Sequence, residues 1–437
     1  MRVRYARCVT ALLWFLAAAG VFVFEAGSSA ENLDAIAGAE QKVQSGPRQP
    51  VGRGMPMPIR FDCTGVGSRC PEFVPLGDAA DHLPGYGPSP FRGFADPSIR
   101  EDPDTGRLWM AYSWPHVKVA PMSTVGVVGV VDIHLAHSDD SGATWLYDGS
   151  LWSAQGEDDP GGSGASGYSS YEVVSLAPHA RAEGTVWYGV RARYFAPDSG
   201  TMTTRRGDSF HLGILQADSP PELATAAEVR LGSFLTAPGW AVDIDLTSLA
   251  PEVADCAIWN EPALHIDGNT LYLTVVCLVF DLSNGERVPL REHIPVFATE
   301  PSGEVDSWSW RYVGRLCGSG EAAELGGETL TQVDLVRGRD GALLALLTPN
   351  DWDPTLGADI HHGCVVVEVA GLNPPALARS PSGALRVRAA ITASDLELYG
   401  PAASGYDPAS STGIVFVRRE WSTEEMVWTL HRTGLHP

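Results

Sequence analysis

The sequence lacks the features that several large classes of protein require. Basic residues are scarce and unclustered, because 30 Lys and Arg stand against 53 Asp and Glu, which gives a net charge of −23. Nucleic acids and anionic membranes attract positive charge, so this acidic chain argues against both as partners. The chain also lacks a glycine-rich phosphate loop, a nucleophile elbow and a Cys-x-x-Cys pair of the kind that binds zinc.

Long apolar runs are absent beyond the N-terminus. The one such run covers residues 9–24, follows an arginine-rich start and precedes small residues up to Ala30. This order is typical of a secretory signal peptide, and the run is short for a membrane span, which needs about 20 residues. We therefore expect residues 1–30 to be the signal peptide of a secreted or periplasmic protein, with an uncleaved N-terminal anchor as the alternative.

Cysteines are few but even in number beyond residue 30, which in a secreted chain predicts disulfide bonds. They are Cys63, Cys70, Cys256, Cys277, Cys317 and Cys364. Cys63 and Cys70 enclose a short loop that contains glycine, and we expect this pair to be bridged. The other four cysteines allow three pairings, which the sequence does not separate.

The strongest motif is Ser138–Trp145, which reads Ser-Asp-Asp-Ser-Gly-Ala-Thr-Trp between two strand-like runs. Aspartate caps its own backbone and glycine adopts positive φ without steric cost, so the segment predicts a tight hairpin. It resembles the Asp box, Ser-x-Asp-x-Gly-x-Thr-Trp, found between the third and fourth strands of β-propeller blades in sialidases and other glycosidases. In those families the Asp box lies away from the active site, so the resemblance implies a structural role for Asp140 and Trp145.

A repeated unit extends along the chain: an acidic residue, a short apolar strand, an Asp-Gly-type turn and a strongly apolar strand. Its copies contain Asp96, Glu172, Glu261, Asp334 and, more weakly, Asp407. Five copies at near-even spacing predict an all-β domain over residues 59–437 that is a five-bladed β-propeller. A six-bladed, sialidase-like propeller is the alternative.

We make separate predictions for the residues that precede this domain and for its last blade. Residues 31–58 are rich in Gly, Pro, Gln and Ala without periodicity, so we expect a flexible N-terminal segment there. The last blade has room for only about three strands before Pro437. A strand within residues 59–75 is therefore expected to complete that blade and close the ring, which would remove an exposed sheet edge.

The repeated acidic residues are candidates for chemistry. The first strand of a propeller blade lines the central axis, so residues that begin these strands converge on one face. Like charges in one pocket push their pKa values apart, which lets one carboxyl act as an acid and another as a base. We expect Asp96, Glu172 and Glu261 to be catalytic and Asp334 to bind substrate. The alternative is that such residues serve as turn residues or as ligands of a cation.

The order Asp, acidic residue, Glu on the first three blades resembles the five-bladed glycosidase superfamily of arabinanases, xylosidases, invertases and levansucrases. The resemblance covers roughly residues 90–420 by blade pattern, with local identity confined to short motifs. It implies that Asp96, before Pro97, is the base or nucleophile and that Glu261, in Asn260-Glu261-Pro262, is the general acid. It also implies that Glu172 orients the substrate and tunes the acid, although the family has Asp at that position.

A sialidase is the rival interpretation. Sialidases bind the substrate carboxylate with three arginines, the first of which belongs to a Phe/Tyr-Arg-Ile-Pro motif. The nearest segment here is Phe91-Arg92-Gly93-Phe94, which lacks Ile-Pro, and Arg193 and Arg337 are the other candidates.

Aromatic and histidine side chains on the same face are further candidates for binding. Trp114 and Trp352 could stack on sugar rings, and His361-His362 could face a central cation. The sequence thus predicts a secreted glycoside hydrolase that cleaves poly- or oligosaccharides with paired carboxylates. A sialidase-like exo-glycosidase and a non-catalytic carbohydrate-binding propeller are the alternatives. No cofactor is expected, with a structural calcium ion as the one exception.

Overall fold

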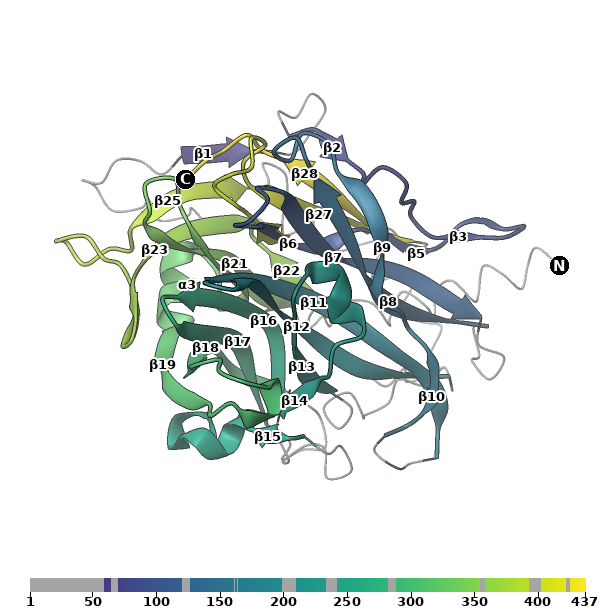
Figure 1. The fold of residues 1–437 in the computed structure, drawn as a ribbon, viewed down its shortest axis with the longest axis horizontal. Helices are drawn as coiled ribbons and strands as arrows, with labels where there is room; N and C mark the ends of the chain where they lie inside the picture. The colour runs from purple at the N-terminus through teal and green to yellow at the C-terminus, as the bar shows by residue number, and fades with distance from the viewer. Residues whose placement is uncertain are drawn as a thin grey trace.

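The computed structural model is a five-bladed β-propeller (Figure 1). It describes residues 59–63, 70–119, 126–160, 162, 164–198, 210–232, 242–281, 288–353, 358–392, 402–421 and 425–437. The predicted fold class is confirmed, and the six-bladed alternative is wrong. The expected signal peptide, 1–30, and flexible segment, 31–58, lie outside the described residues. Among the helices within those ranges, none has the length and apolar character needed to cross a membrane.

Each blade is one sheet of mainly antiparallel strands. The first blade contains β6 (Ala95–Glu101), β7 (Leu108–Val119), β8 (Val127–Ser138) and β9 (Leu146–Trp152). The second contains β10 (Gly156–Asp158), β11 (Ser166–Arg181), β12 (Gly184–Pro197), β13 (Phe210–Ala217), β14 (Val229–Gly232) and β15 (Ile244–Asp245). The third contains β16 (Ile258–Asp267), β17 (Thr270–Asp281), β18 (Val288–Thr299) and β19 (Arg311–Gly318).

The last two blades also contain strands from residues 59–93, which precede the first blade in the chain. The fourth contains β20 (Thr329–Arg337), β21 (Leu343–Asp353), β22 (Ala358–His361), β23 (Cys364–Leu372), β24 (Pro375–Leu377), β25 (Val387–Thr392) and β1 (Ile59–Asp62). The fifth contains β26 (Ala402–Gly405), β27 (Val415–Trp421), β28 (Met426–Arg432), β2 (Glu72–Phe73) and β5 (Phe91–Gly93). The smaller elements are the hairpin β3 (His82–Leu83) and β4 (Gly87–Pro88), helix α3 (Ser319–Leu325), and the 3-10 turns η2 (Pro220–Ala224), η3 (Leu246–Leu249), η4 (Pro251–Val253) and η5 (Val305–Ser307).

The ring closes through contacts at its centre and its edge. The first long strands of the blades touch in a closed circuit, in the order β6, β11, β16, β20, β26 and back to β6. At the edge, β2 pairs antiparallel with β28, so that Phe73 lies opposite Leu430, and β5 pairs parallel with the same strand. These pairings cover the edge of β28, which would otherwise expose unpaired backbone groups. β1 instead extends the fourth blade as a parallel partner of β25.

The Asp box fills the structural role that its motif predicts. The Asp140 carboxylate accepts hydrogen bonds from the Thr144 backbone N–H at 2.8 Å and the Thr144 hydroxyl at 2.6 Å, and Trp145 is buried. Gly142 has a φ of +83°, and a Cβ there would lie 2.8 Å from Ser410 Oγ, so only glycine fits between the first and fifth blades.

The cysteines form two bridges. The expected Cys63–Cys70 disulfide is confirmed, and Cys256 pairs with Cys277. The even count suggested a third bridge, but Cys317 and Cys364 are separate buried thiols on the third and fourth blades.

Candidate active site

A β-bulge interrupts the first long strand of every blade at corresponding places. The pairing register shifts between Ala95 and Ser98, Glu172 and Val174, Asn260 and Ala263, Leu330 and Val333, and Ala402 and Ser404. Four of the bulges contain a residue with positive φ: Asp96 (48°), Val173 (48°), Glu261 (50°) and Ala403 (37°). Such backbone strain in residues other than glycine costs on the order of 1–3 kcal/mol and concentrates at functional sites, where bulges re-aim side chains.

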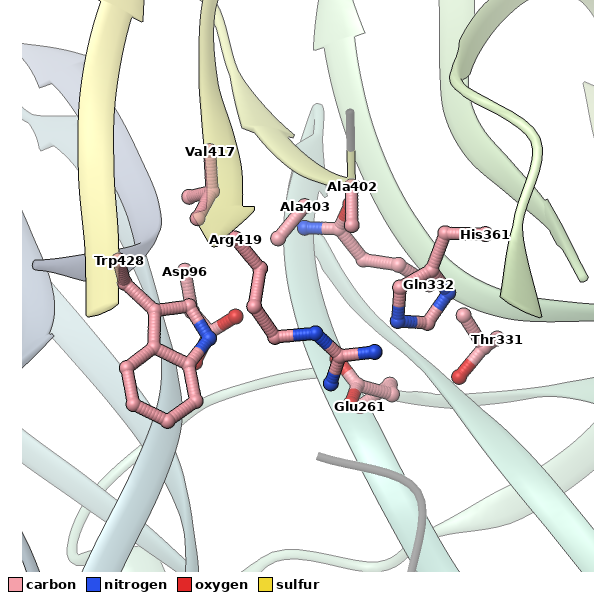
Figure 2. A pocket seen from close by; sticks show the side chains of 10 residues that line it. All are labelled: Asp96, Glu261, Thr331, Gln332, His361, Ala402, Ala403, Val417, Arg419 and Trp428. Atoms are coloured by element: carbon pink, nitrogen blue, oxygen red, sulfur yellow. The ribbon is translucent and has the colours of Figure 1, made fainter. Parts of the chain in front are cut away.

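Asp96 and Glu261 line the same pocket (Figure 2). The rest of the lining consists of Thr331, Gln332, His361, Ala402, Ala403, Val417, Arg419 and Trp428. Because this set includes bulge residues of β6, β16, β20 and β26, the pocket lies where four of the five central strands meet. The structure therefore brings together two of the three predicted catalytic carboxyls.

Asp96 is partly buried, and its surroundings pull its pKa in opposite directions. Burial raises the pKa of the Asp96 carboxyl from 3.8 to about 6, against hydrogen bonds with Ser113 and the Val173 backbone N–H and the positive charge of Arg419, which lower it. The Val173 N–H also donates to Ser113 Oγ at 3.1 Å, which ties the carboxyl to the bulge of the second blade. Asp96 is thus ionised at neutral pH and able to accept a proton or attack an electrophile.

Glu261 is more deeply enclosed, with only 4% of its surface exposed. The side-chain amide of Asn260 donates a hydrogen bond to Glu261 Oε1 at 3.4 Å. Trp259 precedes this pair and packs edge-on against Phe297, with ring centroids 5.7 Å apart. The Glu261 carboxyl is therefore held in one orientation at the pocket by a packed strand.

Arg419 supplies the positive charge of the pocket. It is 4% exposed, and Figure 2 shows it extending from β27 toward Glu261, with Asp96 on one side and His361 on the other. Burial, with the nearby charge of Arg419, lowers the pKa of His361 well below 6.5, so this imidazole is neutral at physiological pH. Among the pocket-lining residues that the structure describes, Arg419 is the only one that carries a positive charge at neutral pH.

Two further side chains give the pocket polar and aromatic character. Gln332 Oε1 accepts a hydrogen bond from the Ser404 backbone N–H at 2.8 Å, which leaves its NH₂ group as the donor it can offer to a ligand. The Trp428 ring is held edge-on by Phe91 at a centroid distance of 4.8 Å. Rigid aromatic faces and oriented amides are suited to binding a neutral polyhydroxy compound.

Glu172 and Asp334 do not line the pocket. In the second blade Val173 occupies the positive-φ position that matches Asp96 and Glu261, so Glu172 lies one residue out of register. In the fourth blade the bulge falls at Thr331 and Gln332. Asp334 lies beyond that bulge.

The partner of Asp334 is Arg100, and both side chains are buried. The guanidinium donates hydrogen bonds of 2.6 and 3.2 Å to the two carboxylate oxygens. Burial raises the pKa of Asp334 in spite of this pairing. The geometry is that of a buried structural ion pair between the first and fourth blades.

Trp114, one of the two predicted aromatic platforms, does not line the pocket. Trp114 stacks on His134 with ring centroids 4.6 Å apart, and its Nε1–H donates to the Ala79 carbonyl at 3.1 Å. It therefore packs between the first blade and the segment that precedes that blade. Trp352 belongs to β21, but its side chain lies outside what the structure describes.

The three arginines suggested for a sialidase clamp do not converge. Each forms an ion pair at a different place: Arg92 with Glu425 at 2.7 Å, Arg337 with Asp267 at 2.7 Å, and Arg193 with Glu157. None of them lines the pocket described above.

One group of three possible metal ligands occurs within the described ranges: Cys256, Cys277 and His293. The two sulfur atoms are joined in a disulfide, so they do not fit a metal ion in this state. The expectation that no cofactor is needed, and the calcium alternative, remain predictions.

Comparison with known proteins finds similar structures but very low sequence identity. No family model and no curated protein matches the chain. Its structure resembles a family 117 glycoside hydrolase from Zobellia galactanivorans at a TM-score of 0.46, with 10% identity over 83% of this chain and 89% of that one. It also resembles a Trypanosoma rangeli sialidase bound to sialic acid (TM-score 0.39, 11% identity, 86% and 60% coverage) and a Bacillus subtilis arabinanase (TM-score 0.39, 10% identity, 78% and 96% coverage). Resemblance at this level assigns neither family nor activity.

Proposed function

We propose that this protein is a glycoside hydrolase that cleaves glycosidic bonds in poly- or oligosaccharides. Asp96 is the base or nucleophile, and Glu261 is the general acid. The observation that supports this proposal most directly is that two carboxyl residues from corresponding bulges in the first and third blades line one pocket.

The chemistry of glycoside hydrolysis matches this pair. One carboxyl group must protonate the leaving oxygen, while the other attacks the anomeric carbon or activates water. Asp96 is ionised above pH 6 or so, which suits the second task. Glu261 then delivers the proton from its enclosed position beside Asn260. We leave Glu172 out of the mechanism because it does not line the pocket.

The remaining pocket residues are suited to a sugar. Trp428 offers an aromatic edge or face to a pyranose or furanose ring, while Gln332 and the neutral His361 can hydrogen-bond to hydroxyl groups. We also propose that the protein acts outside the cytoplasm, as the sequence predicts. The two disulfide bonds support an oxidising compartment.

A panel of natural glycans and aryl glycosides tests the proposal with the full-length protein. We expect at least one substrate to be cleaved, and Asp96→Asn to reduce its turnover at least 100-fold or so. Asparagine tolerates positive φ, so this variant should keep the bulge. Asp306→Asn, at an exposed carboxylate within η5, is the control and should retain full activity. Binding of glycans without cleavage of any would instead establish a carbohydrate-binding propeller.

A further inference from the structure

We infer that Arg419 is a positioning residue for the proposed reaction, and that its guanidinium keeps the Asp96 carboxylate ionised and oriented in the pocket. This inference rests on the proposed roles of Asp96 and Glu261. It concerns a residue on the second strand of the fifth blade, whereas both carboxyls lie on first strands.

The position of Arg419 supports this role. Arg419 and Val417 are two residues apart on β27, and both line the pocket, so their side chains share one face of the strand. Arg419 is almost fully buried and remains charged at any physiological pH. A buried guanidinium requires negative partners, and the pocket offers it the carboxyls of Asp96 and Glu261.

The charges around Asp96 make Arg419 decisive for the ionisation of the Asp96 carboxyl. Besides Asp96, the titratable groups that line the pocket are Arg419 on β27, Glu261 on β16 and His361 on β22. His361 is neutral, and a negative charge on Glu261 can only oppose ionisation of Asp96. Arg419 is therefore the counter-charge that holds the pKa of Asp96 down against burial.

The second blade explains why a single arginine serves as the counter-charge in the pocket. A carboxyl at the matching bulge position would add a third negative charge beside Asp96, but that position holds Val173. With an apolar residue there, the single guanidinium faces two pocket carboxyls rather than three. The pocket then reaches a net charge of −1 when both are ionised and zero when Glu261 carries its proton.

The pKa of Asp96 can be measured without any substrate. Its pKa is higher in the folded chain than the unfolded value of 3.8, so ionisation of Asp96 destabilises the fold progressively as the pH rises from 3.8 to about 6. Asp96→Asn removes this ionisation. The free energy of unfolding of the variant, relative to that of the parent protein, should therefore rise between pH 3.8 and about 6 and stay constant above that pH. Urea unfolding of the full-length protein is measured at successive pH values, with and without this substitution. The pH at which the gain in stability becomes constant is here called the levelling pH, and it reports the pKa of Asp96 in the folded protein.

The same pair of measurements in an Arg419→Gln background tests the inference. We expect the levelling pH to move upward by about 1 unit or more, because a charge partner is lost. Arg419→Lys retains the charge and should shift it less. Arg418→Gln is the matched control: it removes one positive charge from the neighbouring residue, which faces away from the pocket on the same strand, and should leave the levelling pH near 6.

The outcomes separate the two proposals. An unchanged levelling pH in Arg419→Gln would overturn the inference and leave Arg419 as a ligand-binding or packing residue. Arg419→Met provides a second neutral variant if glutamine prevents folding. A shifted pH in a protein that cleaves no glycoside would contradict the proposed function while the electrostatic pairing stands. In an active enzyme, the acidic limb of kcat/KM must move upward together with the levelling pH.

Discussion

Asp96 and Glu261 occupy equivalent positions in two different blades: each is the positive-φ residue of its bulge, at 48° and 50°, and each precedes a proline. Two non-glycine residues in this conformation store strain of order 1–3 kcal/mol each. Both side chains nevertheless line one pocket. The fold therefore tolerates local strain at the two places where it presents carboxyl groups to a common ligand.

Loss of the acidic proton of Glu261 should lower kcat/KM by an amount that depends on the leaving group of the substrate. Glutamine keeps the shape of glutamate but cannot act as an acid. We expect Glu261→Gln to reduce kcat/KM about 10²–10⁴-fold on a natural glycoside and much less on an aryl glycoside with an acidic phenol. Glu304→Gln, an exposed glutamate of the same blade, should have no effect. Equal losses on both substrates would contradict the role of Glu261 as the acid.

The pH dependence of activity should report the ionisation of Asp96. Because Asp96 must be ionised to act, kcat/KM should fall about tenfold per pH unit below pH 6 or so. The profile can be measured from pH 4 to 8, with controls for reversible loss of structure at each pH. A limb that begins near pH 4, the ordinary range of an aspartate, would show that burial does not govern this carboxyl.

Asp334 should matter for stability rather than for catalysis. Asp334→Asn leaves the Arg100 guanidinium buried without its counter-charge, so we expect a loss of about 3–5 kcal/mol in the free energy of unfolding. Replacing both partners with leucine should cost less, because no buried charge remains. Unfolding in urea measures both variants. If Asp334→Asn keeps its stability but loses activity per folded molecule, Asp334 belongs to the active site after all.

The sequence predicted the fold because turns and apolar strands repeat in every blade. The register of each central strand was harder to predict, since one extra residue in a bulge changes which side chain reaches the axis. In the first and third blades, Pro97 and Pro262 mark the bulge, and the expected carboxyls line the pocket. The second and fourth blades lack this proline, and there the acidic residue is not the one that lines the pocket.

Arg419 was not among the predicted site residues, because the repeated acidic unit marks only the first long strand of each blade. A signal was present, since β27 begins with three apolar residues, Val415–Val417, and places Arg419 two residues after Val417. Alternation along a strand predicts that such an arginine faces the same way as the valine. Whether that side faces a pocket or solvent depends on how neighbouring blades pack, which no local pattern records.

The Asp box should stabilise the fold without contributing to activity. Asp140→Ala removes the hydrogen bonds from the Thr144 backbone and hydroxyl, and we expect it to cost about 0.5–1.5 kcal/mol, because water screens this exposed carboxylate. These bonds hold the pKa of Asp140 at about 2, so this contribution is present above pH 4 and is lost as the pH falls toward 2. Asp139→Ala, at an exposed ion pair with Arg107, is the control and should cost less than Asp140→Ala does. A loss of turnover in Asp140→Ala at full folding would contradict the structural role.

The six described cysteines should separate into two classes of reactivity. Burial raises the pKa of the Cys317 and Cys364 thiols, the latter to about 12, so neither should react with iodoacetamide at pH 8 in the folded protein. Denaturant alone should expose both to labelling, whereas Cys256 and Cys277 should be labelled only after reduction. Mass spectrometry of the labelled peptides identifies each site, with the Cys63–Cys70 bridge as an internal control for complete reduction. Labelling of Cys256 without reductant, or a peptide in which Cys317 is linked to Cys364, would show that the pairing of the buried cysteines differs from the one described.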